Sequence, residues 1–242
     1  MKIGVLRTGP VADELVEDFG EYDRVFADYL GPSNPDFSFH GWCVYEGDLP
    51  TAPGEADAWI ISGSKFGVYE DHDWIEPLKA FIRQVADSQT PLIGICFGHQ
   101  IMAEALGGRA IKFQGGWGIG RHIYQTRNMP SWMPETPSEI AIHAIHQDQV
   151  VQRPADATPI AGNSFCENAA LIYGDPEAPY AISIQPHPEF SDKFVKDLIA
   201  VRTATFPKHL RDQALSDMGQ PLDREWASDW IAQFLSVRMS NF

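Results

Sequence analysis

The chain has 242 residues, of which 44% are hydrophobic and 21% are charged, and its formal net charge is −15. This length and composition are typical of a soluble globular protein with enough apolar side chains to form a core. The negative charge disfavours nucleic acid and anionic membrane surfaces as partners, because like charges repel, and no apolar run approaches the roughly 18 residues of a membrane span.

Strand-like and helix-like segments alternate through the first half of the chain. The helical segments carry apolar residues at spacings of three and four, and the strand segments are short and nearly continuously apolar. In chain order we expect strands over 2–6, 37–45, 57–61 and 91–95, and helices over 11–30, 74–87 and 100–106. This alternation predicts an α/β fold with a mostly parallel sheet that helices cover on both faces.

Beyond residue 109 the segments become shorter and are separated by Gly and Pro. The segments 118–124, 139–145, 169–173 and 180–185 have the pattern of antiparallel strands added to the sheet. Two or three amphipathic helices are expected from residue 192 to the end. We find no internal repeat and no long linker, so we expect one domain over 1–242, with a core over about 1–200 and a helical extension over about 201–242.

The apolar run over 91–95 leads into a tight turn at Cys96. The segment Gly94–Gly98 places a glycine two residues before and two residues after the cysteine, and a helical pattern follows. This is typical of a nucleophile elbow, in which glycines relieve crowding around a strained nucleophile. The helix N-terminus stabilises a negative charge on sulfur, and the N–H of Phe97 would point toward an oxyanion formed by attack from Cys96.

The other two cysteines, Cys43 and Cys166, lack such a setting and are expected to be buried structural thiols. Three distant cysteines without a CxxC pair do not form a disulfide framework, which favours the reducing cytoplasm. Only four residues lie between the charges of Lys2 and Arg7, too few for the core of a signal peptide. We therefore expect a cytoplasmic protein.

A cysteine nucleophile needs a histidine within reach, and the histidine needs a group that fixes its tautomer. His187 and Glu189 are two residues apart, hence on one side of an extended segment, and Pro186 and Pro188 make that segment stiff. The pattern predicts a carboxylate–imidazole pair at the end of a strand.

Two further motifs contain residue types that are found in binding sites. His143-x-x-His146-x-Asp148 could bind zinc, but the alternating pattern around it indicates a strand, on which the two histidines would face opposite ways. The glycine-rich segment 115–120 lacks the lysine of a phosphate-binding loop and is better explained by a tight hairpin. We therefore expect neither a metal nor a cofactor, and we expect His99 to be structural or to support the site indirectly.

Together, these residues resemble the class I glutamine amidotransferase family. The shared features are the elbow G-x-C-x-G-x-Q, which ends at Gln100, the downstream His-Pro-Glu, and an early strand that runs into Ser62-Gly63. The resemblance covers about residues 1–200. Gly116-Trp117 and the segment 146–150 make the chain most similar to free-standing relatives of the GMP synthetase glutaminase domain.

The resemblance implies a flavodoxin-like three-layer core and cleavage of a γ-glutamyl amide through a thioester on Cys96. His187 would carry the proton to the leaving ammonia or amine, and Glu189 would hold the imidazole. The backbone N–H groups of Ser64 and Phe97 would form the oxyanion hole.

Substrate binding is also implied by the resemblance. Gln100 would help to hold the glutamyl group, assisted by the backbone near Gln147 and Asp148. The family's early loop reads S-G-G-P-x-S-V, whereas here Ser64 replaces a glycine and Lys65 replaces the proline. Because serine resists a positive φ, we expect either an incompletely preformed oxyanion hole or one that suits a different leaving group.

Three functions agree with these residues. The first is hydrolysis of glutamine to glutamate and ammonia by a free-standing amidotransferase-like protein, with a synthetase supplied by a partner chain. The second is a γ-glutamyl peptidase or hydrolase that acts on peptides or amines without a partner. The third, a non-catalytic binding module, is disfavoured by the intact triad. An exposed apolar patch near the site would favour the first function, and an open pocket with polar walls would favour the second.

Overall fold

The computed structural model describes residues 1–133 and 135–239, without the side chains of Arg238 and Met239. Within this part of the chain, nine strands form one sheet and two form a separate antiparallel pair. The sheet runs in the order β2 (Ser38–Cys43), β1 (Lys2–Arg7), β3 (Ala58–Ile61), β4 (Leu92–Ile95), β11 (Ala181–Ile184), β10 (Ala170–Tyr173), β9 (Ala157–Gly162), β6 (Gly118–Thr126) and β7 (Glu139–His146). The separate pair is β5 (Arg109–Lys112) with β8 (Asp148–Gln152).

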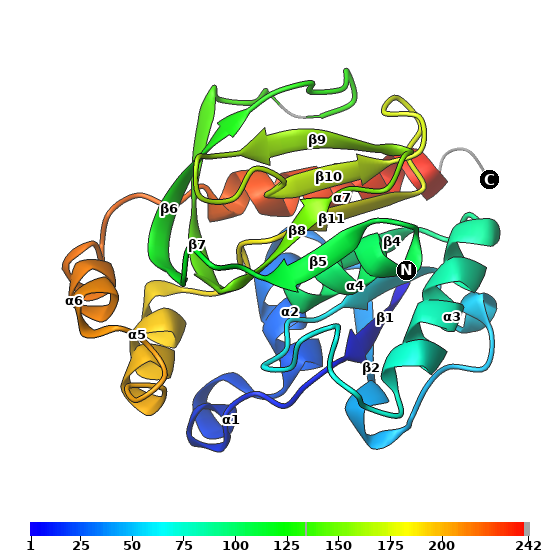
Figure 1. Ribbon diagram of the computed structural model, residues 1–242. Helices are drawn as coiled ribbons and strands as arrows, with labels where there is room; N and C mark the ends of the chain where they lie inside the picture. The colour runs from blue at the N-terminus through cyan, green and yellow to red at the C-terminus, as the bar shows by residue number, and fades with distance from the viewer. Residues whose placement is uncertain (134, 240–242) are drawn as a thin grey trace.

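The first five strands of this order are mutually parallel, and β10, β9, β6 and β7 continue the sheet in antiparallel fashion. In Figure 1 these antiparallel strands gather at the top of the molecule, above the parallel half. The central parallel strands β3 and β4 are buried at every position because helices cover both of their faces, whereas the edge strand β2 is partly exposed. In β3, for example, Ile60 packs into the core on one face and Trp59 into the core on the other.

Two sets of helices make the outer layers. The helices are α1 (Asp13–Phe19), α2 (Tyr22–Leu30), α3 (Ile75–Asp87), α4 (Phe97–Ala105), α5 (Asp192–Val201), α6 (Lys208–Ser216) and α7 (Arg224–Met239). Buried side chains of α1, α2, α5 and α7 share one core, and those of α3 and α4 share the other. The predicted α/β class, with a flavodoxin-like parallel core, antiparallel additions and C-terminal helices, is confirmed. No helix of the described residues is long and apolar enough to cross a membrane.

One expected helix is broken in two. The apolar stripe over 11–30 continues through both α1 and α2, but Gly20 adopts a φ of 74° and ends the first helix. Only glycine takes this conformation readily, so the chain changes direction here although the spacing of apolar residues does not show it.

Three strands were not indicated by the sequence pattern: β5 and β8, which form the separate pair, and β9, which lies in the antiparallel half of the large sheet. β5 has only four residues, and β9 contains Pro159, which weakens the strand signal. The segment 180–185 was expected to be purely antiparallel, but β11 pairs parallel with β4 and antiparallel only with β10. The hairpin expected over 115–120 is wrong, because Gly115-Gly116 forms a turn between β5 and β6, which belong to different sheets.

Candidate active site

Three neighbouring strands, β3, β4 and β11, end at the same edge of the sheet. Parallel pairing aligns Ile61 with Gly94, and Ile184 with Ile95. The segments that follow are the ones singled out in the sequence: 62–64, Cys96 and 186–189. In open α/β sheets this carboxyl edge is where ligands and reacting groups gather.

The backbone at Cys96 is strained. Its φ is 53° and its ψ is −100°, one of three positive φ values among the described non-glycine residues, and it directly precedes α4. The flanking glycines leave no room for side chains: a Cβ on Gly94 would lie 2.6 Å from backbone atoms of Gly98, and a Cβ on Gly98 would lie 2.3 Å from the carbonyl oxygen of Ile61. This close approach explains why the elbow contains glycine on both sides.

His187 and Glu189 form a buried pair. His187 Nδ1 lies 2.7 Å from Glu189 Oε1, and the side chain of Glu189 is fully buried. Because an ionised carboxylate only accepts, Nδ1 carries the proton and Nε2 is left for Cys96. Burial alone would lower the pKa of His187, but the charges of Glu189 and Cys96 and hydrogen bonds to both side chains raise it to about 10.

Gly63 leaves open the space between the cysteine and the histidine. A Cβ at this position would lie 2.8 Å from Cε1 of His187 and 3.7 Å from Cβ of Cys96. Any larger residue would therefore push the imidazole away from the thiol. Cys96 Sγ also lies 4.0 Å from the carbonyl oxygen of Ile145, at the outer limit of a sulfur hydrogen bond.

Arg224, the first residue of α7, holds the segment that contains the pair. Its Nε donates to the carbonyl of Pro188 at 2.8 Å and its NH2 group donates to the carbonyl of Glu189 at 3.0 Å. The hydroxyl of Tyr29 in turn donates to the Arg224 carbonyl at 2.7 Å. Sequence reasoning missed Arg224, because its contacts span 35 and 36 residues and leave no local pattern.

The space beside Cys96 has a second wall, which contains Gln100, His146, Gln147 and Asp148. Gln100 is almost fully buried, and its Nε2 donates to the carbonyl of Asp148 at 2.9 Å and to Oε1 of Gln185 at 3.2 Å. Gln147 Nε2 donates to the carbonyl of Phe113 at 3.2 Å. The glutamine side chains on this wall are therefore held by hydrogen bonds within the protein.

The titratable groups of this second wall are shifted by burial. His146 Nδ1 lies 3.1 Å from the Asp148 carbonyl, so this nitrogen carries the proton, and burial lowers the pKa of His146 to about 3. Burial also raises the pKa of the Asp148 carboxyl, which hydrogen bonds with the hydroxyl of Tyr69. His146 is therefore a neutral imidazole at physiological pH.

The two histidines weighed for zinc point to different partners. His143 Nε2 lies 2.8 Å from Asp192 Oδ1 at the start of α5, whereas His146 turns to the Asp148 backbone. Across residues 1–133 and 135–239, no group of three or more His, Cys, Asp or Glu side chains could hold a metal ion. His99 is completely buried in α4 and pairs with Ser183 at 2.7 Å.

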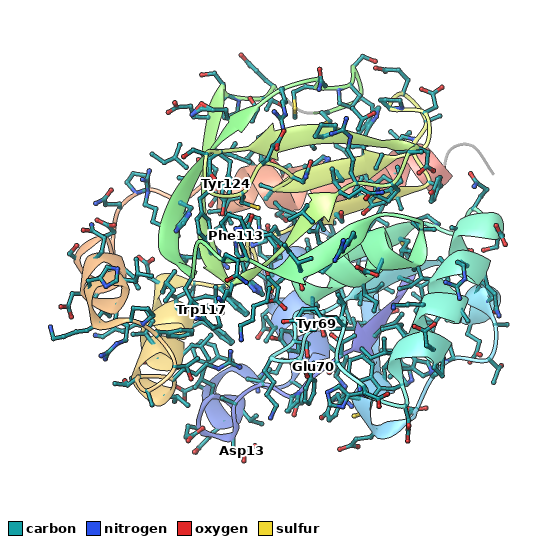
Figure 2. The ribbon with its side chains drawn as sticks, in the orientation of Figure 1. Asp13, Tyr69, Glu70, Phe113, Trp117 and Tyr124 are labelled. Atoms are coloured by element: carbon teal, nitrogen blue, oxygen red, sulfur yellow. The ribbon has the colours of Figure 1, made fainter. Side chains whose placement is uncertain are left out.

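A cavity of about 460 Å³ opens beside Cys96. Most of the residues that line it have polar or charged side chains, although polar and apolar atoms contribute about equally to its surface. They come from the loop after β3, from α4, from β5 and the segment after it, from the β7–β8 junction and from the end of α5. Figure 2 labels three of them, Tyr69, Glu70 and Trp117. A second, water-sized cavity of about 20 Å³ lies beside His187 and shares Ser64, Ile145 and Arg202 with the first.

A family model described as glutamine amidotransferase class-I matches residues 45–199. The chain belongs to the class I glutamine amidotransferase family. It is 28% identical to γ-glutamyl peptidase 4 of Arabidopsis thaliana, over 78% of this chain and 76% of that protein. It is 30% identical to the glutamine-hydrolysing GMP synthase of Vibrio atlanticus, over 72% of this chain but only 32% of that protein. A crystal structure of a glutamine amidotransferase from Thermotoga maritima shares the fold, with a TM-score of 0.73 and 21% identity over 100% of this chain and 99% of that one.

In this member of the family, the unusual Ser64 adopts no positive φ, so the strain expected of a serine here does not arise. Its hydroxyl donates to the Thr8 carbonyl at 2.7 Å and accepts from the N–H of Phe66 at 3.1 Å. The serine side chain thus ties the loop to the end of β1. The backbone N–H groups of Ser64 and Phe97 donate to no acceptor in the described part of the chain.

Proposed function

We propose that this amidotransferase-family protein hydrolyses γ-glutamyl amide bonds through a thioester on Cys96, with γ-glutamyl peptides as its preferred substrates. The observation that carries the proposal is the cavity of about 460 Å³ beside Cys96. This volume is within the roughly 300–1,000 Å³ typical of pockets for small molecules. A glutamine releases only ammonia, which needs little space, whereas a peptide needs room on both sides of the nucleophile.

In the proposed reaction, the thiolate of Cys96 attacks the γ-carbonyl carbon and the oxygen becomes an oxyanion. The N–H groups of Ser64 and Phe97 stabilise this charge. The Nε2 proton of His187 passes to the leaving nitrogen, the C–N bond breaks and a thioester remains. His187 then takes a proton from water, whose oxygen attacks the thioester. The C–S bond breaks, which releases the glutamyl acid and restores the Cys96 thiolate beside protonated His187, and the acid loses its proton to solvent as glutamate. Glu189 keeps the imidazole in the required tautomer.

The glutamyl group would lie against the wall of Gln100, Gln147 and Asp148. These residues line the same cavity as Cys96, and internal hydrogen bonds hold Gln100 and Gln147 in place. Such preorganisation lowers the cost of ordering side chains when the substrate binds. No cofactor enters any step of the proposed reaction.

A glutaminase that passes ammonia to a partner synthetase is the second candidate. The similarity to a GMP synthase over 72% of this chain favours it. Of the large apolar side chains that are exposed in the described structure (Tyr69, Ile123, Val151, Val201 and Leu215), however, only Tyr69 lines the cavity. A single exposed apolar side chain at the cavity gives less support to a docking surface than the open cavity, lined mostly by polar residues, gives to a hydrolase.

A cytoplasmic location fits the proposed chemistry, because the nucleophile must stay a reduced thiol. Cys43, Cys96 and Cys166 are all free and buried. Reducing compartments keep such thiols unpaired.

The test is turnover by the isolated protein on glutamine and on a panel of γ-glutamyl dipeptides. We expect kcat/KM to be higher for at least one dipeptide than for glutamine, and the Cys96→Ala variant to be inactive on all of them. Efficient use of glutamine with poor cleavage of every dipeptide would reject the peptidase proposal and favour the glutaminase.

A further inference from the structure

Three basic side chains line the cavity of an otherwise acidic protein. They are Lys65, Lys112 and Arg202, in a chain with 33 acidic and 18 basic residues. Some basic residues elsewhere, such as Arg7 and Lys193, have a carboxylate within ion-pair distance, and others, such as Arg127, donate to a backbone carbonyl. Among the described residues, none of the three cavity cations has such a partner. Their positive charge is therefore available to a ligand.

Arg202 lies on the side of the cavity where the leaving group must be. It directly follows α5 and lines both the cavity that contains Cys96 and the small cavity that contains His187. Its charge also acts on the buried hydroxyl of Tyr22, which faces the small cavity. In the proposed reaction His187 delivers the proton to the leaving nitrogen. The leaving group therefore lies between His187 and Arg202, at the rim of the cavity, by which we mean its half-buried and exposed residues Lys65, Trp117 and Arg202.

Lys65 and Lys112 lie on different sides of the cavity. Lys65 directly follows Ser64, which lines both cavities as Arg202 does. Lys112 instead acts on the Asp148 carboxyl and so belongs to the glutamyl wall. Lys65 and Arg202 are therefore the two cations beside the leaving group.

An amino acid leaving group has its carboxylate one carbon away from the scissile nitrogen. A site for this carboxylate must therefore adjoin the place where the proton is delivered, which is where Arg202 and Lys65 lie. The planar guanidinium of arginine binds carboxylates through two parallel hydrogen bonds. Arg202 is half-buried, so solvent and salt screen its attraction to a carboxylate less than they would at a fully exposed position.

From this placement we infer that Arg202, assisted by Lys65, binds the free carboxylate of the leaving group. Resting on the proposed function, this inference narrows the substrate class to γ-glutamyl peptides whose leaving amino acid has a free α-carboxylate. γ-Glutamyl amines, and peptides with a blocked C-terminus, lack the group that Arg202 recognises and are poorer substrates. Hydrolysis adds water across the γ-glutamyl C–N bond and leaves the carboxylate of the leaving amino acid unchanged.

A matched substrate pair tests the inference: γ-glutamyl-alanine and γ-glutamyl-alaninamide, which differ only at the carboxylate. We expect the wild type to prefer the acid, and Arg202→Gln to lower kcat/KM about tenfold on the acid while changing it little on the amide. Arg202→Lys should keep part of the preference, and Lys65→Gln should reduce it by a smaller factor. Added salt should weaken the preference for the acid, because the subsite is partly exposed.

The control is Lys196→Gln, which removes the same charge from an exposed position on α5 outside either cavity. This variant should leave both rates unchanged. Equal losses on acid and amide in Arg202→Gln would overturn the subsite, because they would indicate a structural role, and so would a wild type that does not distinguish the two substrates. If the wild type cleaves neither substrate, nor any other γ-glutamyl dipeptide, the proposed function itself fails and the subsite fails with it.

Discussion

Cys96 and the residues Gln100 and His146 on the wall of the cavity are almost wholly buried. At the rim of the cavity, Trp117 and Arg202 are half-buried and Lys65 is exposed. On the wall, hydrogen bonds within the protein fix the side chains. On the rim, the basic side chains have no carboxylate partner among the described residues. A rigid wall suits the part of the reaction common to every substrate, and an open rim suits a variable leaving group.

This difference between wall and rim predicts how substitutions affect the two substrates, and kinetics on γ-glutamyl-alanine and its amide test the prediction. Substitutions in the buried machinery should lower kcat/KM by the same factor on γ-glutamyl-alanine and on its amide. Substitutions on the rim should change the ratio of the two rates.

Cys96→Ala should produce the largest effect, a loss of about 10⁴-fold or more on both substrates, because no nucleophile remains. The variant should also fail to react with an electrophilic glutamine analogue, as measured by intact-protein mass spectrometry. Cys43→Ala and Cys166→Ala serve as controls and should still be labelled. Labelling that persists in Cys96→Ala would overturn the assignment of the nucleophile.

Glu189→Gln should cost about 10²- to 10⁴-fold on both substrates while leaving measurable activity, because it removes the charge that orients His187. The carboxylate helps to raise the pKa of His187, so the alkaline limb of the kcat/KM profile should move to lower pH in the variant. An unchanged alkaline limb would contradict the pairing.

The same pair affects stability. The pKa of His187 is raised from 6.5 to about 10 in the folded protein. Its protonation therefore stabilises the fold fully below pH 6.5, and this stabilisation is lost as the pH rises toward 10. Denaturant unfolding should show a steeper loss of stability across this range in the wild type than in Glu189→Gln. Equal slopes would contradict the raised pKa.

Arg224→Gln should lower kcat about 10- to 100-fold on both substrates, because the 186–189 segment loses two hydrogen bonds that position the histidine. KM should change less than kcat. The matched control is Arg127→Gln, which removes a guanidinium that donates to the Glu167 carbonyl, away from the cavity. A loss on only one of the two substrates would mean that Arg224 contributes to leaving-group recognition, as the rim residues do, and would contradict a role in positioning His187.

Ser64→Ala should have the smallest effect, roughly fivefold on both substrates. The change removes the hydroxyl that ties the loop to Thr8, a contribution of about 1 kcal/mol, but keeps the backbone N–H. Kinetics at saturating substrate measure this loss. A reduction of 10²-fold or more would mean that the hydroxyl itself contacts the reacting atoms.

Local patterns predicted the parts of this site that depend on neighbours in sequence. The glycines around Cys96 follow from the crowding of a tight strand-to-helix turn, and the prolines around His187 from the stiffness of an extended segment. Strands β1, β3 and β4 were predicted because strands buried on both faces are apolar at nearly every position. The edge strand β2 is only partly buried, and it was predicted from its aromatic content. The break at Gly20 was not predicted, because a change of direction leaves the apolar spacing intact.

The sequence by itself thus determined the α/β class, the elbow at Cys96 and the histidine–glutamate segment, since each depends on residues a few positions apart. Only the tertiary structure decided that Arg224 holds the segment, that Ser64 is tied to Thr8, and that Arg202 joins Lys65 at the rim. These contacts link residues far apart in the chain, and their partners are chosen by how the helices pack around the sheet. The cavity volume has the same origin, because no single segment encloses it.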